Sequence, residues 1–162
     1  MGLLLRWAIV VTSDKVKANP ELDQITPMAR ELIAARGHDI VYTAIAGNDK
    51  VEILHAIAEA LARGADVVLV TGGTGPNPRD VSADIVYSLC ERALPGIGEE
   101  FRRRSIEKGV VNAMLSRAGA CGFAGRVLAV SPGNPDAARL MLELLFEIAG
   151  HVVEQLRGAK HS

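Results

Sequence analysis

A glycine-rich polar segment, residues 71–80, is the part of the sequence best suited to binding an anion. It follows the apolar run 67–70 and reads Thr-Gly-Gly-Thr-Gly-Pro-Asn-Pro-Arg-Asp. Glycines lack the Cβ atoms that would hinder a ligand's approach, so their N–H groups can face a phosphate. Ser82 can cap a following helix, whose positive end would add to the attraction. The P-loop spacing and the dinucleotide fingerprint are both absent, and the alternative is a plain glycine–proline turn.

Two other polar segments also follow apolar runs. The apolar run at 8–11 is followed by Thr12, Ser13 and Asp14. The apolar run at 127–130 is followed by residues 131–135 (Ser-Pro-Gly-Asn-Pro). Either segment could hold a ligand, or it could only cap or turn the chain.

Three aspartates could supply hard oxygen ligands to a divalent cation. Asp14 and Asp80 lie in the segments just described, and Asp49 stands at the head of an expected helix. Mg²⁺ is commonly bound by one or two carboxylates together with substrate phosphates. Because a single aspartate is more often a helix cap, this prediction depends on the three reaching one edge of the fold.

The elements between these segments predict a parallel sheet covered on both faces. Short apolar runs without alternation are typical of strands buried on both sides, and helical spacing of apolar residues occurs between them. We expect strands at 8–11, 40–43, 67–70 and 127–130 and helices at 22–33, 51–61 and 141–156, with a hairpin at 120–131 that leads into the last strand as an alternative. Asn48 is a candidate cap for the second helix. In such an α/β fold, ligands bind beyond the carboxyl ends of the strands.

Composition narrows the class of protein. The 162 residues are 49% hydrophobic with a net charge of −1, which fits one domain and argues against nucleic-acid binding. The apolar N-terminus lacks a signal peptide's basic region and cleavage site, and no run is long enough to span a membrane, so we expect a soluble cytoplasmic protein.

We expect Cys90 and Cys121 to be two buried thiols, a disulfide being the less favoured alternative. The four histidines show no zinc-ligand spacing.

Taken in order along the chain, these residues resemble the signature of the Mog/MoaB family of molybdenum-cofactor biosynthesis proteins. The resemblance runs from residue 7 to residue 156, and the series of segments is more specific than any one of them. The matching segments are Ser13-Asp14, Asp49, 71–76 with 79–81, 94–101, 115–117, and 132–135.

The resemblance implies an α/β fold of three layers, α/β/α, with a mostly parallel sheet, and we expect residues 1–162 to form a single molybdopterin-binding domain. It implies a molybdopterin adenylyltransferase, in which Mg-ATP and molybdopterin give adenylyl-molybdopterin and pyrophosphate. It also implies a homotrimer or homohexamer that hands its product to a separate molybdate-inserting protein.

The same resemblance assigns site residues. Asp49 and Asp80 match the family's functional acids, and we expect them to be catalytic and to hold Mg²⁺. The expected substrate-binding residues are Ser13, Asp14, Thr71, Gly72, Gly73, Thr74, Gly75, Ser116, Arg117, Pro132, Gly133 and Asn134. Asp136 stands where the family often has a lysine, and Arg139, on the next helical turn, is the candidate substitute.

Two other functions stay open from the sequence. A non-catalytic molybdopterin-binding or scaffold protein of the same pathway would bind the pterin and ignore ATP. A nucleotide-binding α/β protein unrelated to molybdenum would bind ATP and no pterin.

Overall fold

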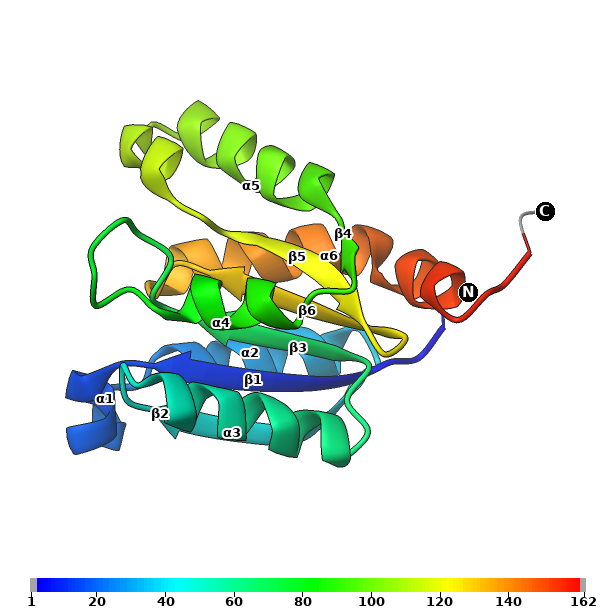
Figure 1. Cartoon of the computed structure of the whole chain (residues 1–162), viewed down its shortest axis with the longest axis horizontal. Helices are drawn as coiled ribbons and strands as arrows, with labels where there is room; N and C mark the ends of the chain where they lie inside the picture. Colours follow the sequence, from blue (N-terminus) through cyan, green and yellow to red (C-terminus); the bar gives the residue numbers. More distant parts are fainter. Residues whose placement is uncertain (1–2, 161–162) are drawn as a thin grey trace.

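A six-stranded sheet forms the centre of the computed structural model, which describes residues 3–160 (Figure 1). Its strand order is β2-β1-β3-β6-β5-β4. The strands are β1 (Arg6–Thr12), β2 (Asp39–Ala46), β3 (Val67–Thr71), β4 (Arg92–Ala93), β5 (Gly119–Phe123) and β6 (Arg126–Ser131). The first three and β6 pair in parallel, and the β5–β6 hairpin and β4 extend the sheet in antiparallel fashion. The expected strands and hairpin are therefore confirmed.

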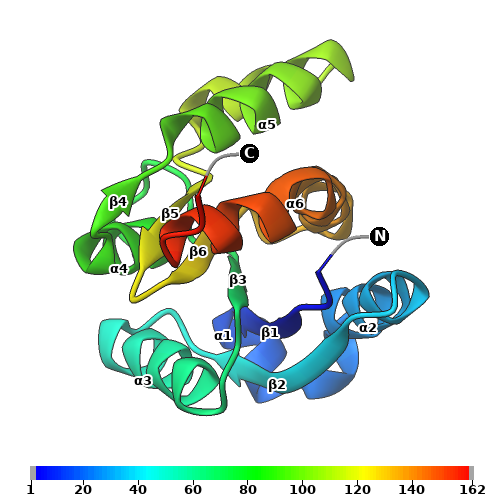
Figure 2. The same cartoon turned by 90° about the vertical axis from the view of Figure 1, so that its right-hand side faces the viewer.

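Helices cover both faces of the sheet, so the three-layer α/β/α prediction is also confirmed. They are α1 (Asp14–Ala18), α2 (Ile25–Ala35), α3 (Lys50–Ala62), α4 (Ser82–Leu89), α5 (Pro95–Glu107) and α6 (Pro135–Leu156), with short 3₁₀ helices η1 (Pro20–Leu22) and η2 (Val111–Leu115). Figure 2 shows α2 and α6 on one face and α3 and α4 on the other. Helix α5 packs against β5, α6 and η2. None of the helices within residues 3–160 is long and apolar enough to cross a membrane.

The central strands lack polar alternation because each of their faces meets helices. In β1, Trp7 and Ile9 pack into the core under α2 and α6, whereas Ala8 and Val10 pack into the core under α3 and α4. Fully burying a large apolar side chain contributes about 1.5–3 kcal/mol. Two-sided burial thus makes these short strands the most strongly fixed elements of the fold.

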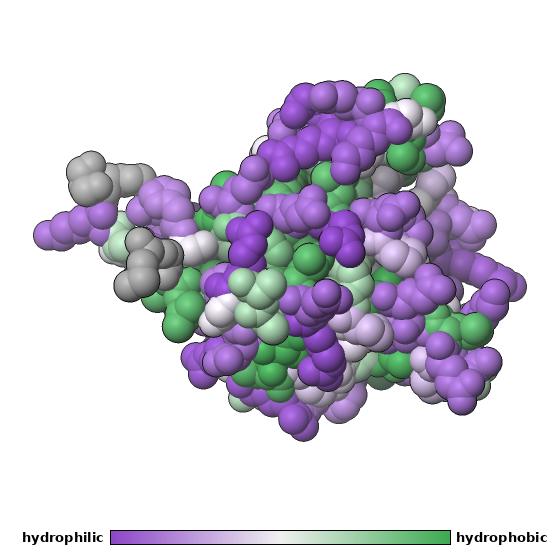
Figure 3. Space-filling model, turned by 180° about the vertical axis from the view of Figure 1, so that it is seen from behind, coloured by the Kyte–Doolittle hydropathy of each residue, from purple (hydrophilic) through white to green (hydrophobic). Residues whose placement is uncertain are grey.

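A groove separates part of helix α5 from helix α6. Figure 3 shows hydrophilic side chains along its outer side and apolar ones in the groove beneath it. This groove is lined mainly by residues from the first turns of α5 and from the second half of α6, among them Leu94, Ile97, Leu144 and Ile148. The position of α5 matters for function because its other end covers part of the strand-end edge.

Two expected helix caps differ in the structure. Asp49, and not Asn48, caps α3, because the Asp49 Oδ2 atom accepts the Glu52 N–H at 2.9 Å. Ser82 lies inside the first turn of α4, with Val81 as the N-cap. The Ser82 hydroxyl is turned inward and lies 3.0 Å from the Thr12 hydroxyl, so it is engaged in the core and not in capping.

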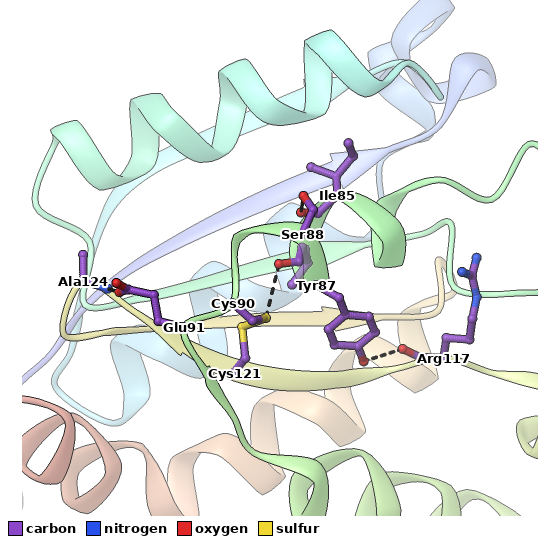
Figure 4. Close-up of a disulfide and its surroundings, with 9 residues drawn as sticks. Ile85, Tyr87, Ser88, Cys90, Glu91, Arg117, Cys121 and Ala124 are labelled. Carbon is purple, nitrogen blue, oxygen red and sulfur yellow. Dashed lines mark hydrogen bonds between the residues drawn. A yellow bond between two sulfur atoms is a disulfide. The ribbon is translucent and has the colours of Figure 1, made fainter.

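The two cysteines form a disulfide, and the expectation of two thiols was wrong (Figure 4). Cys90 ends α4 and Cys121 lies in β5, 31 residues apart in the sequence but with Cα atoms 5.7 Å apart. The packing of α4 against the hairpin brings them together. That packing leaves no local pattern in the sequence around either cysteine.

Candidate functional site

The carboxyl ends of β1, β2, β3 and β6 meet at one edge of the sheet, at the left of Figure 1. The register places Thr71 beside Val11 on one side and beside Ser131 on the other, and Thr12 beside Ala46. Every segment singled out at a strand end therefore emerges at this edge. The expectation that they share an edge is confirmed.

The first two glycines after β3 are required by the protein's own packing. Gly72 and Gly73 have φ angles of +102° and +75°, which other residues rarely adopt. A Cβ atom on Gly72 would lie 2.5 Å from the Thr12 carbonyl oxygen, and one on Gly73 would lie 2.5 Å from the Ser82 hydroxyl. These glycines let the loop lie close against β1 and α4, which fixes the position of the residues that follow.

Residues 116–118 hold the glycine loop from the other side. The Arg117 N–H donates to the Thr74 carbonyl at 2.8 Å, and the Arg117 guanidinium donates to the Gly75 and Asp80 carbonyls at 2.9 Å each. The same guanidinium pairs with the Asp84 carboxylate at 2.6 Å, and this hydrogen bond lowers the pKa of Asp84. Arg117 thus acts as a brace on the loop in this structure.

A second row of contacts supports the brace. The Tyr87 hydroxyl donates to the Arg117 carbonyl at 2.6 Å (Figure 4), and burial raises the pKa of Tyr87, so the hydroxyl keeps its proton. Arg102 on α5 donates to the Ser116 and Ala118 carbonyls at 3.2 and 2.8 Å. Helices α4 and α5 therefore both fix the segment that fixes the loop.

A cavity of about 840 Å³ opens between the glycine loop, η2, the C-terminal half of α5 and the N-terminal half of α6. Its polar and charged lining residues include Thr74, Asp80, Ser105, Lys108, Asn112, Ser116, Asn134, Asp136, Arg139 and Glu143. Its apolar lining residues include Phe101, Ala113 and Leu140. A space of this size, lined by apolar side chains together with several polar ones, is typical of a small-molecule site.

The predicted site residues divide into two groups. We call the residues around this cavity (72–80, 112–117 and 132–143) the roofed half of the edge, and residues 13–18 and 46–52 the open half. The predicted residues that line the cavity are Gly73, Thr74, Gly75, Asp80, Ser116, Pro132, Gly133 and Asn134. Ser13, Asp14, Asp49, Thr71, Gly72 and Arg117 are not among its lining residues.

Thr71 and Gly72 lie beneath the loop rather than in the cavity. Thr71 is fully buried at the end of β3, and its Oγ1 atom finds no hydrogen-bond partner within residues 3–160. Gly72 lies against the turn at residues 132–135, which we call the PGNP turn. A Cβ atom built on Gly133 would be 3.1 Å from the Gly72 Cα atom. The two strand-end loops are thus in direct contact.

Helix caps and backbone contacts occupy the acidic side chains of the open half. The Asp14 Oδ1 atom accepts the Asn48 N–H at 2.9 Å, and the Asp49 Oδ2 atom caps α3. The Glu52 carboxylate pairs with Lys17, and the hydrogen bond from Lys17 lowers the pKa of Glu52. Asp14 and Asp49 are exposed, and here the edge is an open surface of mixed charge, since Lys15, Lys17 and Lys50 lie in the same segments.

The carboxylates at this edge suit a metal ion that takes its remaining ligands from a substrate. Within residues 3–160, no three acidic, histidine or cysteine side chains come close enough to form a metal cage. Asp49 and Asp80 each use Oδ2 to accept a backbone N–H, and neither Oδ1 atom has a partner in the part of the chain described. Mg²⁺ needs only one or two such carboxylates when phosphates supply other ligands.

Several residues that line the cavity were not predicted as part of the site, among them Phe101, Ser105, Lys108 and Glu143. The spacing of the three α5 residues places them on one face of that helix, as Glu143 shares a face of α6 with Asp136 and Arg139. The sequence could have revealed each face by itself. It contains no signal that the two faces enclose one space.

Comparisons with known proteins find matches along nearly the whole chain. The family model described as "Probable molybdopterin binding domain" matches residues 8–151. The chain is 32% identical over 156 residues to a molybdopterin adenylyltransferase of Pyrococcus furiosus, covering 94% of this chain and 91% of that protein. It is 34% identical over 155 residues to molybdenum cofactor biosynthesis protein B of Bacillus anthracis, covering 94% and 90%.

A solved structure shows the same fold. The crystal structure of the tungsten cofactor synthesizing protein MoaB from Pyrococcus furiosus superposes with a TM-score of 0.86 at 30% identity, covering 97% of this chain and 99% of that one.

Proposed function

The chain belongs to the molybdopterin-binding domain family, and on that premise we propose that it is a molybdopterin adenylyltransferase of molybdenum cofactor biosynthesis. The observation that carries the proposal is the 840 Å³ cavity beside the glycine loop. Relatives that align along nearly the whole chain bear the name of this enzyme. A cavity lined both by a glycine loop and by apolar side chains suits a substrate that carries both a phosphate and a flat ring.

The proposed reaction joins a phosphate oxygen of molybdopterin to the α-phosphorus of ATP. The bond from the α-phosphorus to the bridging oxygen breaks, and pyrophosphate leaves with that electron pair. Such transfers depend on positioning and on neutralising charge, with no need for a protein nucleophile. In this proposal residues 73–75 and the turn at 132–134 hold the phosphates, and Thr71 and Gly72 support the loop from beneath. Ser13 and Asp14 orient one substrate. Ser116 contacts the substrate directly. Arg117 acts indirectly, by holding the glycine loop that contacts the substrate.

In this proposal Asp49 and Asp80 hold Mg²⁺ through the carboxylate oxygens that the backbone does not use. When bound, the ion would offset negative charge on the α-phosphate and on the leaving pyrophosphate. Asp80 lines the cavity and Asp49 lies in the open half, so the nucleotide would extend from one half toward the other.

We assign the cationic contacts of the cavity to Lys108 and Arg139. They line it from α5 and α6, and neither side chain forms an ion pair within residues 3–160. Asp136, which takes the place of the lysine expected from the family, lines the same cavity. In this proposal Arg139, about one helical turn farther along α6, supplies the positive charge that a lysine at residue 136 would supply.

We further propose that residues 1–162 act as one domain, that the chain works as a homotrimer or homohexamer in the cytoplasm, and that its product passes to a molybdate-inserting protein. These points follow from the family resemblance.

The direct test is release of pyrophosphate from ATP by the purified protein with molybdopterin and Mg²⁺. We expect release only when all three are present, with equal amounts of adenylyl-molybdopterin. Calorimetric binding of molybdopterin with no binding of Mg-ATP and no turnover would support the non-catalytic scaffold instead. Binding of Mg-ATP without any molybdopterin binding would reject both.

A further inference from the structure

Part of the cavity wall is formed by apolar side chains from three elements. Phe101 on α5 is 1% exposed and Leu140 on α6 is 6% exposed, and both line the cavity. Ala113 of η2 closes a third side. Burying a flat aromatic ring against such walls would be favourable, and nothing on these three side chains can recognise a polar group.

Glu143 adds a carboxylate to the wall of the same cavity. It is half-buried and lines the cavity, and its side chain makes no hydrogen bond or ion pair within residues 3–160. The cavity's two cations, Lys108 and Arg139, do not pair with it, and the neighbouring Ser105 hydroxyl donates to the Phe101 carbonyl. A carboxylate removed from water in part, with no partner in the protein, is an acceptor available to a ligand's N–H donors.

The distance along α6 fits a substrate with two different ends. Glu143 and Asp136 lie on the same face of α6, two turns apart, which corresponds to about 10 Å. Asp136 is beside the PGNP turn and the glycine loop, where the phosphate is assigned. A ring at Glu143 would thus lie about one small-molecule length from the phosphate.

We propose that Glu143 is a specificity residue that recognises the amino-pyrimidinone edge of the substrate's pterin ring. This inference rests on the proposed function and names the subsite of its pterin. The 2-amino group and the N3–H of a pterin are adjacent parallel donors, and a carboxylate accepts two such bonds at once. Phe101 and Leu140 would enclose the ring faces.

The test uses two ligands that differ at this edge. Pterin carries the 2-amino group, whereas lumazine has an oxygen there that would face the carboxylate. We expect the wild-type protein to bind pterin at least about tenfold more tightly than lumazine, because a site built for an N–H donor rejects an analogue without it. Glu143→Gln should reduce this preference to about twofold or less. Fluorescence quenching by each ligand measures it.

The matched control is Glu154→Gln, an exposed residue on α6 outside the cavity, which should keep the wild-type preference. Turnover gives a second measurement: Glu143→Gln should raise the KM for molybdopterin about tenfold and leave the KM for ATP unchanged. Equal melting temperatures of the variants would exclude a folding defect. A Glu143→Gln protein with an unchanged ligand preference, or with an unchanged KM for molybdopterin, would overturn the inference while the proposed function stands. Wild-type protein that neither binds pterins nor turns over molybdopterin would overturn both.

Discussion

The roofed and open halves of the strand-end edge use similar residues but make different surfaces. Each has an aspartate that accepts a backbone N–H, and each follows strands that pair in parallel. The 840 Å³ cavity lies in the roofed half, because the chain between α4 and β5 forms α5 and η2, which pass over that side. The comparison shows that motifs at strand ends provide reactive groups, whereas the long connection makes the enclosed volume.

The sharpest way to test this division is to compare Asp80→Asn with Asp49→Asn. Asparagine can keep the backbone contact of each aspartate and removes its charge. We expect both variants to lower pyrophosphate release at least about a hundredfold. Only Asp80→Asn should also weaken molybdopterin binding, since only Asp80 lines the cavity. Single-turnover rates and calorimetry measure the two effects, and equal loss of pterin binding in both variants would contradict the division.

Arg117→Lys tests whether the brace on the glycine loop matters to the roofed half alone. Lysine cannot reach the Gly75 and Asp80 carbonyls and the Asp84 carboxylate together. We expect KM values to rise about tenfold, a loss typical of one charged hydrogen bond. Arg63→Lys, in an exposed pair on α3, is the control and should leave turnover unchanged. A brace variant with unaltered KM values would show that the loop holds its shape without Arg117.

Opening the disulfide should loosen the roofed half and spare the open one. Cys90–Cys121 ties α4 to β5 close to residues 116–118, so we expect the Cys90→Ala, Cys121→Ala double variant to lose about 3 kcal/mol of unfolding free energy. Urea unfolding measures the loss. Hydrogen exchange should quicken at residues 116–118 and stay constant at residues 46–49. Equal acceleration in both segments would mean that the bond stabilises the whole fold evenly.

The smallest expected effect lies at the opposite edge and provides a control for both halves. The His38 Nδ1 atom accepts the Leu5 N–H at 2.9 Å between Trp7 and Phe146. Burial, with a contribution from the Arg36 charge, lowers the pKa of His38. The fold therefore favours the neutral ring: this stability is complete above the unfolded pKa of about 6.5 and is lost as the pH falls through the lower folded value.

Melting temperatures measured from pH 7.5 to 5 should thus fall less steeply in His38→Gln than in the wild type. Turnover between pH 7.5 and 6.5 should be the same in both proteins. A His38→Gln protein with the wild-type slope would assign the acid sensitivity to other groups.

The strand-end chemistry was accessible from the sequence because it is local. The run 67–70 followed by Thr-Gly-Gly-Thr-Gly indicated a buried strand and a tight loop, and the register confirms that Thr71 ends β3. Capping was predicted less well: Asn48 and Asp49 are both good caps, and only the turn after β2 selected Asp49. For Gly72 and Gly73 the sequence indicated ligand access, whereas the structure shows contact with Thr12 and Ser82.

The sequence by itself determined the parallel sheet, the edge at which its loops gather and the family that the chain resembles. It could do so because apolar periodicity and the order of motifs depend on residues that are close together in the chain. Tertiary structure alone decided the Cys90–Cys121 bond, the Arg117 brace and the meeting of Glu143 with Phe101. Each of these joins elements far apart in the chain. Their contacts depend on how α4, α5 and α6 pack around one hairpin, and packing of distant surfaces leaves no periodic trace in the sequence.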